Sequence, residues 1–144
     1  MKLEDIQQLW EHDSDIDRTE LGEESLRIPQ LHSKYFKLYS NERLVLKKYQ
    51  ADYKQLYKDK FQYYNGTLDE ETLRERQWEP NPLKILRTDI PVHIDGDKDL
   101  QLIQMKVDIQ EEKITFLESA IKSLTNRGFQ IKAAIDWAKF QNGA

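Results

Sequence analysis

A seven-residue repeat in the last third of the chain constrains the fold more than any other feature of the sequence. Two positions of this repeat, three residues apart, continue from Leu100 to Ala138, and ten of the twelve residues at these positions are apolar. They are Leu100, Val107, Ile114, Ile121, Gly128 and Ile135, and then Ile103, Gln110, Leu117, Leu124, Ile131 and Ala138. Such a seam is typical of a helix that packs along a helical neighbour, as in a coiled coil.

A second apolar stripe, formed by Leu102, Ile109 and Phe116, widens the surface that this helix must bury. Charged residues make up 33% of the chain, so each of the other elements offers only a narrow apolar face to cover it. The sequence therefore predicts that other copies of the chain complete the seam. The expected subunit contacts are Leu100, Ile103, Val107, Ile114, Leu117, Ile121, Leu124, Ile131 and Ile135.

The rest of the pattern is also helical, which predicts an all-α chain of long, kinked and coiled-coil-like helices. Apolar spacing indicates a short helix over residues 3–12 and a long one that ends at Asn65-Gly66. Pro29 is expected to kink or break this long helix. Gly128 is expected to end the C-terminal long helix, followed by a last helix over 129–140.

Residues 83–94 are the least regular part of the sequence. Their β-branched side chains are compatible with one or two short strands, whereas Pro91 favours an irregular connector. The acidic run 95–99 lacks the glycine and glutamate positions of a calcium-binding loop. We therefore expect these acids to cap the next helix.

Several classes of function are disfavoured by what the sequence lacks. It has no cysteines, and His12, His32 and His93 are far apart, so we expect no metal site. Its five glycines form no phosphate-binding loop, and we expect no cofactor and no enzymatic activity. No apolar run reaches the roughly 18 residues of a membrane-spanning helix. The opening MKLEDIQQLW is too acidic for a signal peptide.

Charge is distributed unevenly along the chain. The net charge is −4, but residues 1–33 carry −6 (three basic, nine acidic) and residues 34–60 carry +5 (eight basic, three acidic). On a helix with about 100° per residue, four of these basic residues fall within about 60° of one another. They are Arg43, Lys47, Lys54 and Lys58, here called the basic stripe. Such a stripe is either solvated surface or a contact for an anion, including the phosphates of DNA.

Aromatic residues accompany the basic stripe at Tyr57, Phe61, Tyr63 and Tyr64. Unpaired bases stack on aromatic rings, so lysines mixed with aromatics are typical of single-strand binding proteins. An aromatic core beside a solvated lysine face gives the same pattern. The residues alone leave both interpretations open.

Lys60 does not fit a solvated face, because it projects near the middle of the apolar side of the helix. It either lines a DNA groove between subunits or is a buried lysine paired with a carboxylate. The aromatic Tyr63-Tyr64 and the helix end that follow favour the groove.

Five segments, in this order and spacing, resemble the UvsY family of recombination mediators of T4-like bacteriophages. They are the opening LEDIQ, Ile16-Asp17-x-Thr19-x-Leu21, Leu31-His32-Ser33-Lys34-Tyr35, a basic-x-basic triplet ahead of Tyr63-Tyr64-x-Gly66, and Arg127-Gly128-Phe129-x-Ile131-Lys132. The resemblance extends over the whole chain.

This resemblance implies a non-enzymatic protein that binds single-stranded DNA as a ring-shaped homo-oligomer, of six or seven subunits in the family. Its other partners would be a RecA-like phage recombinase and the phage single-strand binding protein, in the cytoplasm of the infected bacterial host. On this basis we expect a single domain over 1–144, with a DNA-binding part (1–95) and an oligomerisation part (96–144).

The DNA-binding triplet of the family falls on Lys58, Asp59 and Lys60, where this chain departs from the pattern in two ways. Asp59 replaces a small residue, and Lys60 replaces an arginine with its planar, bidentate fork. We expect the acid to weaken the local positive charge and to shift binding toward the rest of the basic stripe. The expected DNA-binding residues are Lys58, Lys60, Lys54, Lys47, Arg43, Phe61, Tyr57, Tyr63 and Tyr64. A structural helical oligomer, or a protein–protein adaptor without DNA binding, remains the alternative.

Overall fold

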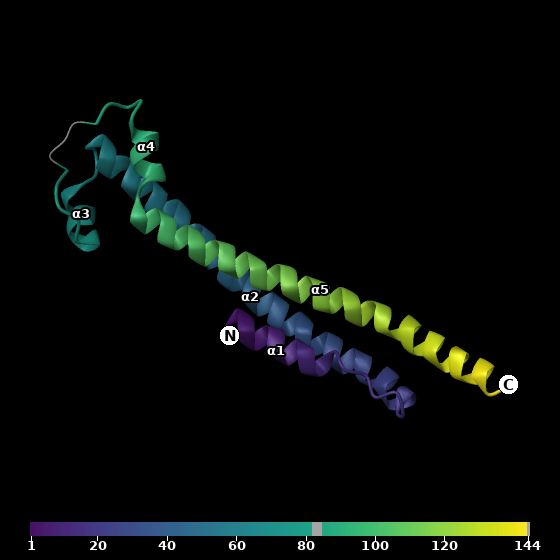
Figure 1. Cartoon of the computed structure of the whole chain (residues 1–144). Coiled ribbons are helices and arrows are strands. Elements are labelled where there is room, and N and C mark those ends of the chain that lie inside the picture. Colours follow the sequence, from purple (N-terminus) through teal and green to yellow (C-terminus); the bar gives the residue numbers. More distant parts are fainter. Residues whose placement is uncertain (82–84, 144) are drawn as a thin grey trace. The chain divides into compact units, whose positions relative to one another are not determined.

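The computed structural model describes residues 1–81 and 85–143, and these residues form five helices without a strand (Figure 1). The helices are α1 (Leu3–Asp13), α2 (Leu21–Asn65), α3 (Glu70–Arg76), α4 (Ile90–Asp95) and α5 (Lys98–Gln141). The all-α expectation is confirmed. The strand considered for 83–94 is wrong for 85–94, which contain a turn and α4, and residues 83 and 84 lie outside the described residues. None of the described helices is long and apolar enough to cross a membrane.

The chain divides into two compact units. Unit 1 consists of Met1–Leu44 and Ile109–Ala144, and unit 2 of Val45–Asp108. Each unit contains part of α2 and part of α5. These compact units are not the two functional parts expected from the sequence (1–95 and 96–144), and that functional division stays a prediction.

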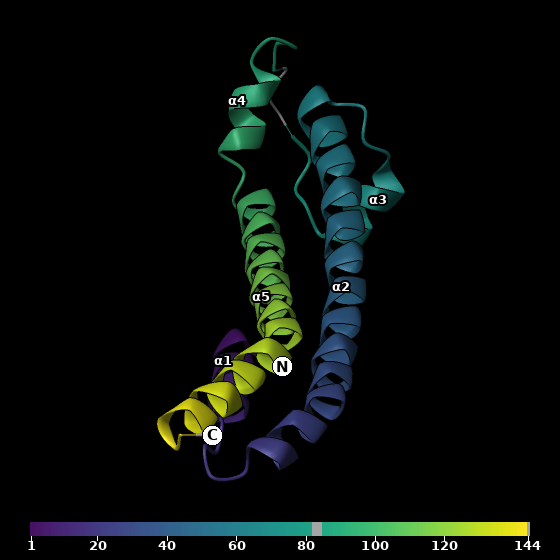
Figure 2. The same cartoon turned by 90° about the vertical axis from the view of Figure 1, so that its right-hand side faces the viewer.

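Both long helices continue past the residue at which the sequence indicated an interruption, which was a kink or break at Pro29 and a helix end at Gly128. α2 passes through Pro29 without a break, although its ribbon bends near its N-terminal end (Figure 2). α5 passes through Gly128, so the predicted helix end there is wrong. An interior proline costs a helix about 3 kcal/mol and an interior glycine about 1 kcal/mol. Buried neighbours such as Leu31 and Leu124 offset these costs, since each buried leucine stabilises by roughly 1.5–3 kcal/mol.

The end of α2 is confirmed at Asn65, where Gly66 takes a positive φ of 82°. A left-handed residue after the last turn is the usual way for a glycine to end a helix. Gly66 ends a helix, whereas Gly128 lies within one. Gly128 has no positive φ, and a Cβ atom added to it would have no neighbouring atom within 4 Å.

Replacing Gly128 with alanine should therefore stabilise the fold, by about 0.5–1 kcal/mol, because alanine loses less backbone entropy in a helix interior. Gly66→Ala is the matched control and should destabilise, since alanine is strained at positive φ. Denaturant unfolding of both variants measures the effect. A destabilised Gly128→Ala variant would contradict an open helical position at this glycine.

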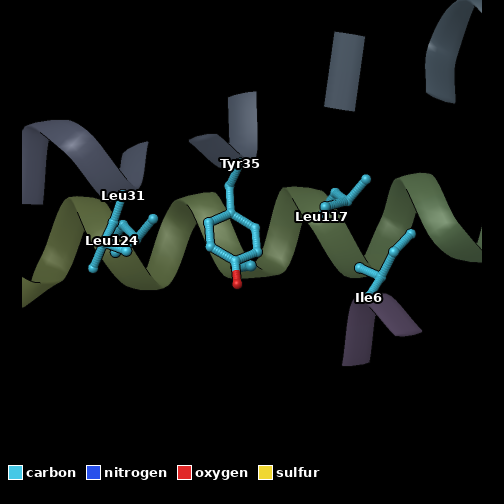
Figure 3. Packing of buried hydrophobic residues seen from close by; sticks show 6 residues of the cluster. Ile6, Leu31, Tyr35, Leu117 and Leu124 are labelled. Atoms are coloured by element: carbon cyan, nitrogen blue, oxygen red, sulfur yellow. The ribbon is translucent and has the colours of Figure 1, made fainter. Parts of the chain in front are cut away.

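The core of unit 1 forms where α1, α2 and α5 meet. Ile6 of α1, Leu31 and Tyr35 of α2, and Leu117 and Leu124 of α5 are all buried there (Figure 3). The Tyr35 hydroxyl donates a hydrogen bond to Asp13 Oδ2 at 2.8 Å. This bond satisfies the polar end of the largest buried side chain, so the ring can fill the core without an unpaired hydroxyl.

Most of the seam on α5 is covered within this one chain. Of the nine seam residues expected at subunit contacts, Leu100, Val107, Ile114, Leu117, Leu124 and Ile131 are buried, and Ile103, Ile121 and Ile135 are half-buried. The expectation that other copies must complete the seam is therefore wrong for its six buried positions, whereas Leu102 and Ile109 of the second stripe are 61% and 52% exposed. Within unit 1, Leu117 and Leu124 of the seam pack with Leu31 and Tyr35 of α2. Within unit 2, Leu100 of the seam packs with Leu56 of α2.

Gln110, the polar residue that interrupts the seam, also contacts α2 within unit 1. Gln110 is 2% exposed, and its Nε2 donates hydrogen bonds to the backbone oxygen of Glu42 at 2.8 Å and to its side-chain Oε2 at 2.5 Å. A buried amide that finds its partner in only one alignment favours that register of the two helices.

Unit 2 has its own core at the end of α2 and the beginning of α5. Leu56, Ile90, Ile94 and Leu100 are buried in it, and these residues come from α2, α4 and α5. Half-buried aromatic residues pack around this core. They are Tyr53, Phe61, Tyr64 and Trp78.

Candidate nucleic-acid interface

The four residues of the basic stripe are exposed along α2. Lys47, Lys54 and Lys58 lie on the part of α2 that belongs to unit 2, and Arg43 lies on the part that belongs to unit 1. Within residues 1–81 and 85–143, the three lysines form no ion pair. The guanidinium of Arg43 lies over the Tyr39 ring, 5.4 Å from its centroid. The lysine charges are thus free to meet an anion from solution.

Lys60 is in a different environment, although it is only two residues from Lys58. Its side chain is 7% exposed, and its Nζ lies 3.0 Å from Asp97 Oδ2 and 2.9 Å from Asp99 Oδ2. The ammonium also lies 4.1 Å from the centroid of the Trp78 ring, a short cation–π contact. Of the two explanations for Lys60, the structure shows the buried lysine paired with carboxylates. The preference for a groove between subunits is therefore not supported.

Asp97 is the centre of this buried cluster. Its Oδ1 accepts the backbone N–H of Leu100 at 3.0 Å, which caps the first turn of α5, and its Oδ2 accepts the Tyr64 hydroxyl at 2.5 Å. Burial alone raises the pKa of Asp97, but the hydrogen bonds from Tyr64, Leu100 and Lys60 outweigh it and hold the pKa below its ordinary value. Burial, together with the same bond, raises the pKa of Tyr64. The carboxylate therefore stays ionised opposite Lys60.

Asp59 is also engaged inside the fold. Its Oδ2 accepts two hydrogen bonds from Arg76 of α3, at 2.8 Å from Nη2 and 3.1 Å from Nε, and its Oδ1 accepts one from Gln55 at 3.0 Å. Arg76 thus compensates the charge of Asp59, which is 5% exposed. The expectation that Asp59 removes positive charge from the DNA-binding surface is wrong.

Three of the four aromatic residues expected at the site support the fold instead of facing solvent. Phe61 packs against the core of unit 2. Tyr63 donates its hydroxyl to the backbone oxygen of Glu79 at 2.7 Å, and its ring meets Trp78 edge to face at 5.3 Å. Tyr64 is held by Asp97, as described above. Only Tyr57, at 41% exposure, leaves much of its ring accessible.

Sequence reasoning missed the partners of the triplet: Arg76, Trp78, Asp97 and Asp99. One signal was available, because Lys60 projects into the apolar face and must there find a carboxylate. The acids of 95–99 were expected to cap a helix, which Asp97 does. Its second role, as the partner of Lys60, depends on a contact across 37 residues that no local pattern encodes.

Comparison with known proteins shows to which family this chain belongs. The sequence matches the family model described as "Recombination, repair and ssDNA binding protein UvsY" over residues 9–144. The chain belongs to the UvsY family. It is 26% identical over 143 residues to the recombination protein uvsY of Enterobacteria phage T4, covering 99% of each chain.

Solved structures of UvsY have the same fold. The structure resembles the crystal structure of the bacteriophage T4 recombination mediator protein UvsY in lattice type II with a TM-score of 0.85 and 25% identity, covering 99% of this chain and 98% of that one. For lattice type IV the TM-score is 0.84, also at 25% identity, with 97% and 99% covered. The family resemblance noted in the sequence is therefore confirmed.

Within this UvsY-family chain, the basic-x-basic triplet is divided between two environments. Lys58 is exposed and forms no ion pair with the described residues, whereas Asp59 and Lys60 hold α3 and the start of α5 against the end of α2. The triplet is one charged motif in the sequence, but only one of its two ammonium groups, that of Lys58, is accessible at the surface of α2.

Proposed function

We propose that this chain is a non-enzymatic recombination mediator that binds single-stranded DNA as a homo-oligomer. It would promote loading of a RecA-like phage recombinase onto DNA covered by the phage single-strand binding protein, in the cytoplasm of the infected host. The observation that carries this proposal is a stripe of exposed lysines on α2, without ion pairs among the residues that the structure describes, in a member of the UvsY family. Ammonium groups that are not committed to internal carboxylates can neutralise phosphates.

The proposed DNA contacts are the basic stripe and Tyr57. Lys60, Phe61, Tyr63 and Tyr64, which the sequence also suggested, would act indirectly by holding the end of α2. Phosphate contacts position a strand without reading its sequence, so we expect binding to be largely independent of sequence.

We place the contact between copies of the chain at the C-terminal end of α5, within the part (96–144) expected to oligomerise. Phe129, Trp137 and Phe140 are 76%, 59% and 72% exposed, and the rings of Trp137 and Phe140 stack at 5.6 Å. A groove of about 580 Å³ beside Trp137 is lined by apolar residues that include Ile131 and Leu21, together with polar residues such as Asp15 and Arg18. Exposed apolar patches of this kind mark protein interfaces. A ring of six or seven copies would use this patch in place of the buried seam.

The double substitution Lys54→Ala, Lys58→Ala tests the DNA-binding proposal. It should weaken binding to every single-stranded oligonucleotide, and the plot of log affinity against log salt should flatten by roughly 0.7 for each phosphate that is no longer neutralised. Fluorescence anisotropy of a labelled oligonucleotide measures both effects.

Lys122→Ala, Lys132→Ala is the matched control, because it removes the same charge from exposed positions of α5. It should leave the slope unchanged. If the unaltered protein binds no oligonucleotide even at low salt, the alternative of a structural oligomer or adaptor without DNA binding is favoured instead.

A further inference from the structure

A groove of about 510 Å³ opens in unit 2 beside Tyr57, which is the one lining residue that the function proposed above uses. Its volume falls within the range of roughly 300–1,000 Å³ typical of small-molecule sites. Its walls come from three helices of the unit. They include Tyr53 and Tyr57 of α2, Pro91 and Ile94 of α4, and Gln101 and Gln104 of α5.

The two tyrosines give the groove an aromatic wall. Their ring centroids are 6.2 Å apart, with 36° between the ring planes. Tyr53 packs on the core of unit 2, whereas Tyr57 is 41% exposed, so a fixed ring supports an accessible one. A supported ring with an accessible surface is a suitable platform for a flat heteroaromatic ligand.

The two glutamines add polar groups to an otherwise largely apolar groove. Gln101 Nε2 donates to the backbone oxygen of Asp95 at 2.9 Å, and Gln104 Nε2 donates to Asp108 Oδ1 at 2.8 Å. These bonds orient the amides, and neither carbonyl oxygen accepts a hydrogen bond from the described residues. Such oxygens can accept N–H groups from the edge of an unpaired base.

The charges around the groove favour different positions for the base and for the phosphates of a nucleotide. Asp95 is among the residues that line the groove, and its negative charge disfavours a phosphate inside it. Lys54 and Lys58 each follow one of the groove tyrosines by a single residue, and both are exposed. A base can therefore enter the groove while its flanking phosphates remain with the lysines.

We propose that this groove binds one unpaired base of single-stranded DNA, stacked on Tyr57 and contacted by the amides of Gln101 and Gln104. This inference rests on the proposed function and extends it, because it adds recognition of unpaired bases to recognition of phosphates. A base in a duplex is stacked on its neighbours and cannot enter, so the groove gives the protein a preference for single strands.

Binding of the full-length oligomer to two oligonucleotides of equal length tests this inference. One is oligo(dT), and the other has the same phosphates but abasic sugars. Stacking of one base is worth roughly 5- to 150-fold in affinity, so the unaltered protein should bind the abasic strand more weakly by at least this factor. Tyr57→Ala should reduce this ratio toward one with an unchanged salt slope, and Tyr57→Phe should retain it.

Phe36→Ala is the matched control, because Phe36 is an exposed aromatic residue of α2 that does not line the groove. It should leave the ratio unchanged. Equal affinity of the unaltered protein for both strands would overturn the base site, while a normal salt slope would leave the proposed function intact. A changed oligomeric mass of Tyr57→Ala, without a change in the ratio, would assign the groove to another copy of the chain and also overturn the inference. Absence of binding to either strand would contradict both proposals.

Discussion

Replacing Lys60 with alanine should lower the free energy of unfolding by about 3–5 kcal/mol, the usual cost of removing one partner from a buried ion pair. The variant leaves Asp97, which is 6% exposed, without its ammonium partner. It also removes the cation–π contact with Trp78. Because Asp97 caps α5, the loss should affect the junction between α2 and α5 directly. Chemical denaturation followed by circular dichroism measures the change.

Lys58→Ala is the control for this experiment, since it removes the same charge two residues away from an exposed position. Its unfolding free energy should stay within about 0.5 kcal/mol of the unaltered protein. Equal stability of Lys60→Ala and Lys58→Ala would mean that the Lys60–Asp97 pair does not support the fold.

Introducing charge into the exposed apolar patch at the C-terminal end of α5 (Phe129, Trp137 and Phe140, here called the C-terminal patch) should have the largest effect on DNA binding. None of these three residues is proposed to touch DNA. Trp137→Glu, Phe140→Glu places two carboxylates on the proposed contact between copies, and both positions are exposed, so the fold of one chain should survive. The variant should sediment as a much smaller species. Weak sites that hold one strand together gain roughly 10²- to 10⁴-fold in affinity, and the dissociated variant should lose this gain.

Leu26→Glu is the control, because it introduces a charge at an exposed apolar position of α2 that does not line the groove beside Trp137. It should change neither mass nor affinity. An unchanged mass of the double variant would exclude the C-terminal patch as the main contact, and a reduced mass with full affinity would point to a self-sufficient site in each subunit. Leu117→Glu cannot be used to test the contact between copies. Leu117 is 0% exposed within one chain, so a charge at this position should unfold the protein.

The helices could be predicted from the sequence because periodicity and turn chemistry are local. The spacing of apolar residues located α1, and Asn65-Gly66 located the end of α2. The break considered at Pro29 does not occur, and the helix end expected at Gly128 is wrong, because the local cost of these residues is smaller than the gain from the buried side chains around them. The partner of the seam was also missed, since a heptad pattern shows that a helix has a neighbour but not whether this neighbour belongs to the same chain.

For the candidate site, the sequence predicted which lysine side chains are exposed, but not which distant side chains the other residues of the site contact. The projection correctly separated Lys58 from Lys60, because helix geometry alone places them on different faces. The environment of Lys60 depends on Asp97 and Asp99, which reach it only when α5 packs back on α2. The role of Asp59 likewise depends on Arg76 in α3.

The salt dependence of single-strand binding, compared between Lys58→Ala and Lys60→Ala, tests most directly whether the triplet is divided between DNA contact and fold. Both variants are measured at a temperature where both remain folded. We expect Lys58→Ala to flatten the plot of log affinity against log salt by roughly 0.7 for each phosphate left without its ammonium group, and Lys60→Ala to retain the slope of the unaltered protein. A flattened slope for Lys60→Ala with undiminished stability would contradict the account, because it would place Lys60 on the DNA instead of beside Asp97.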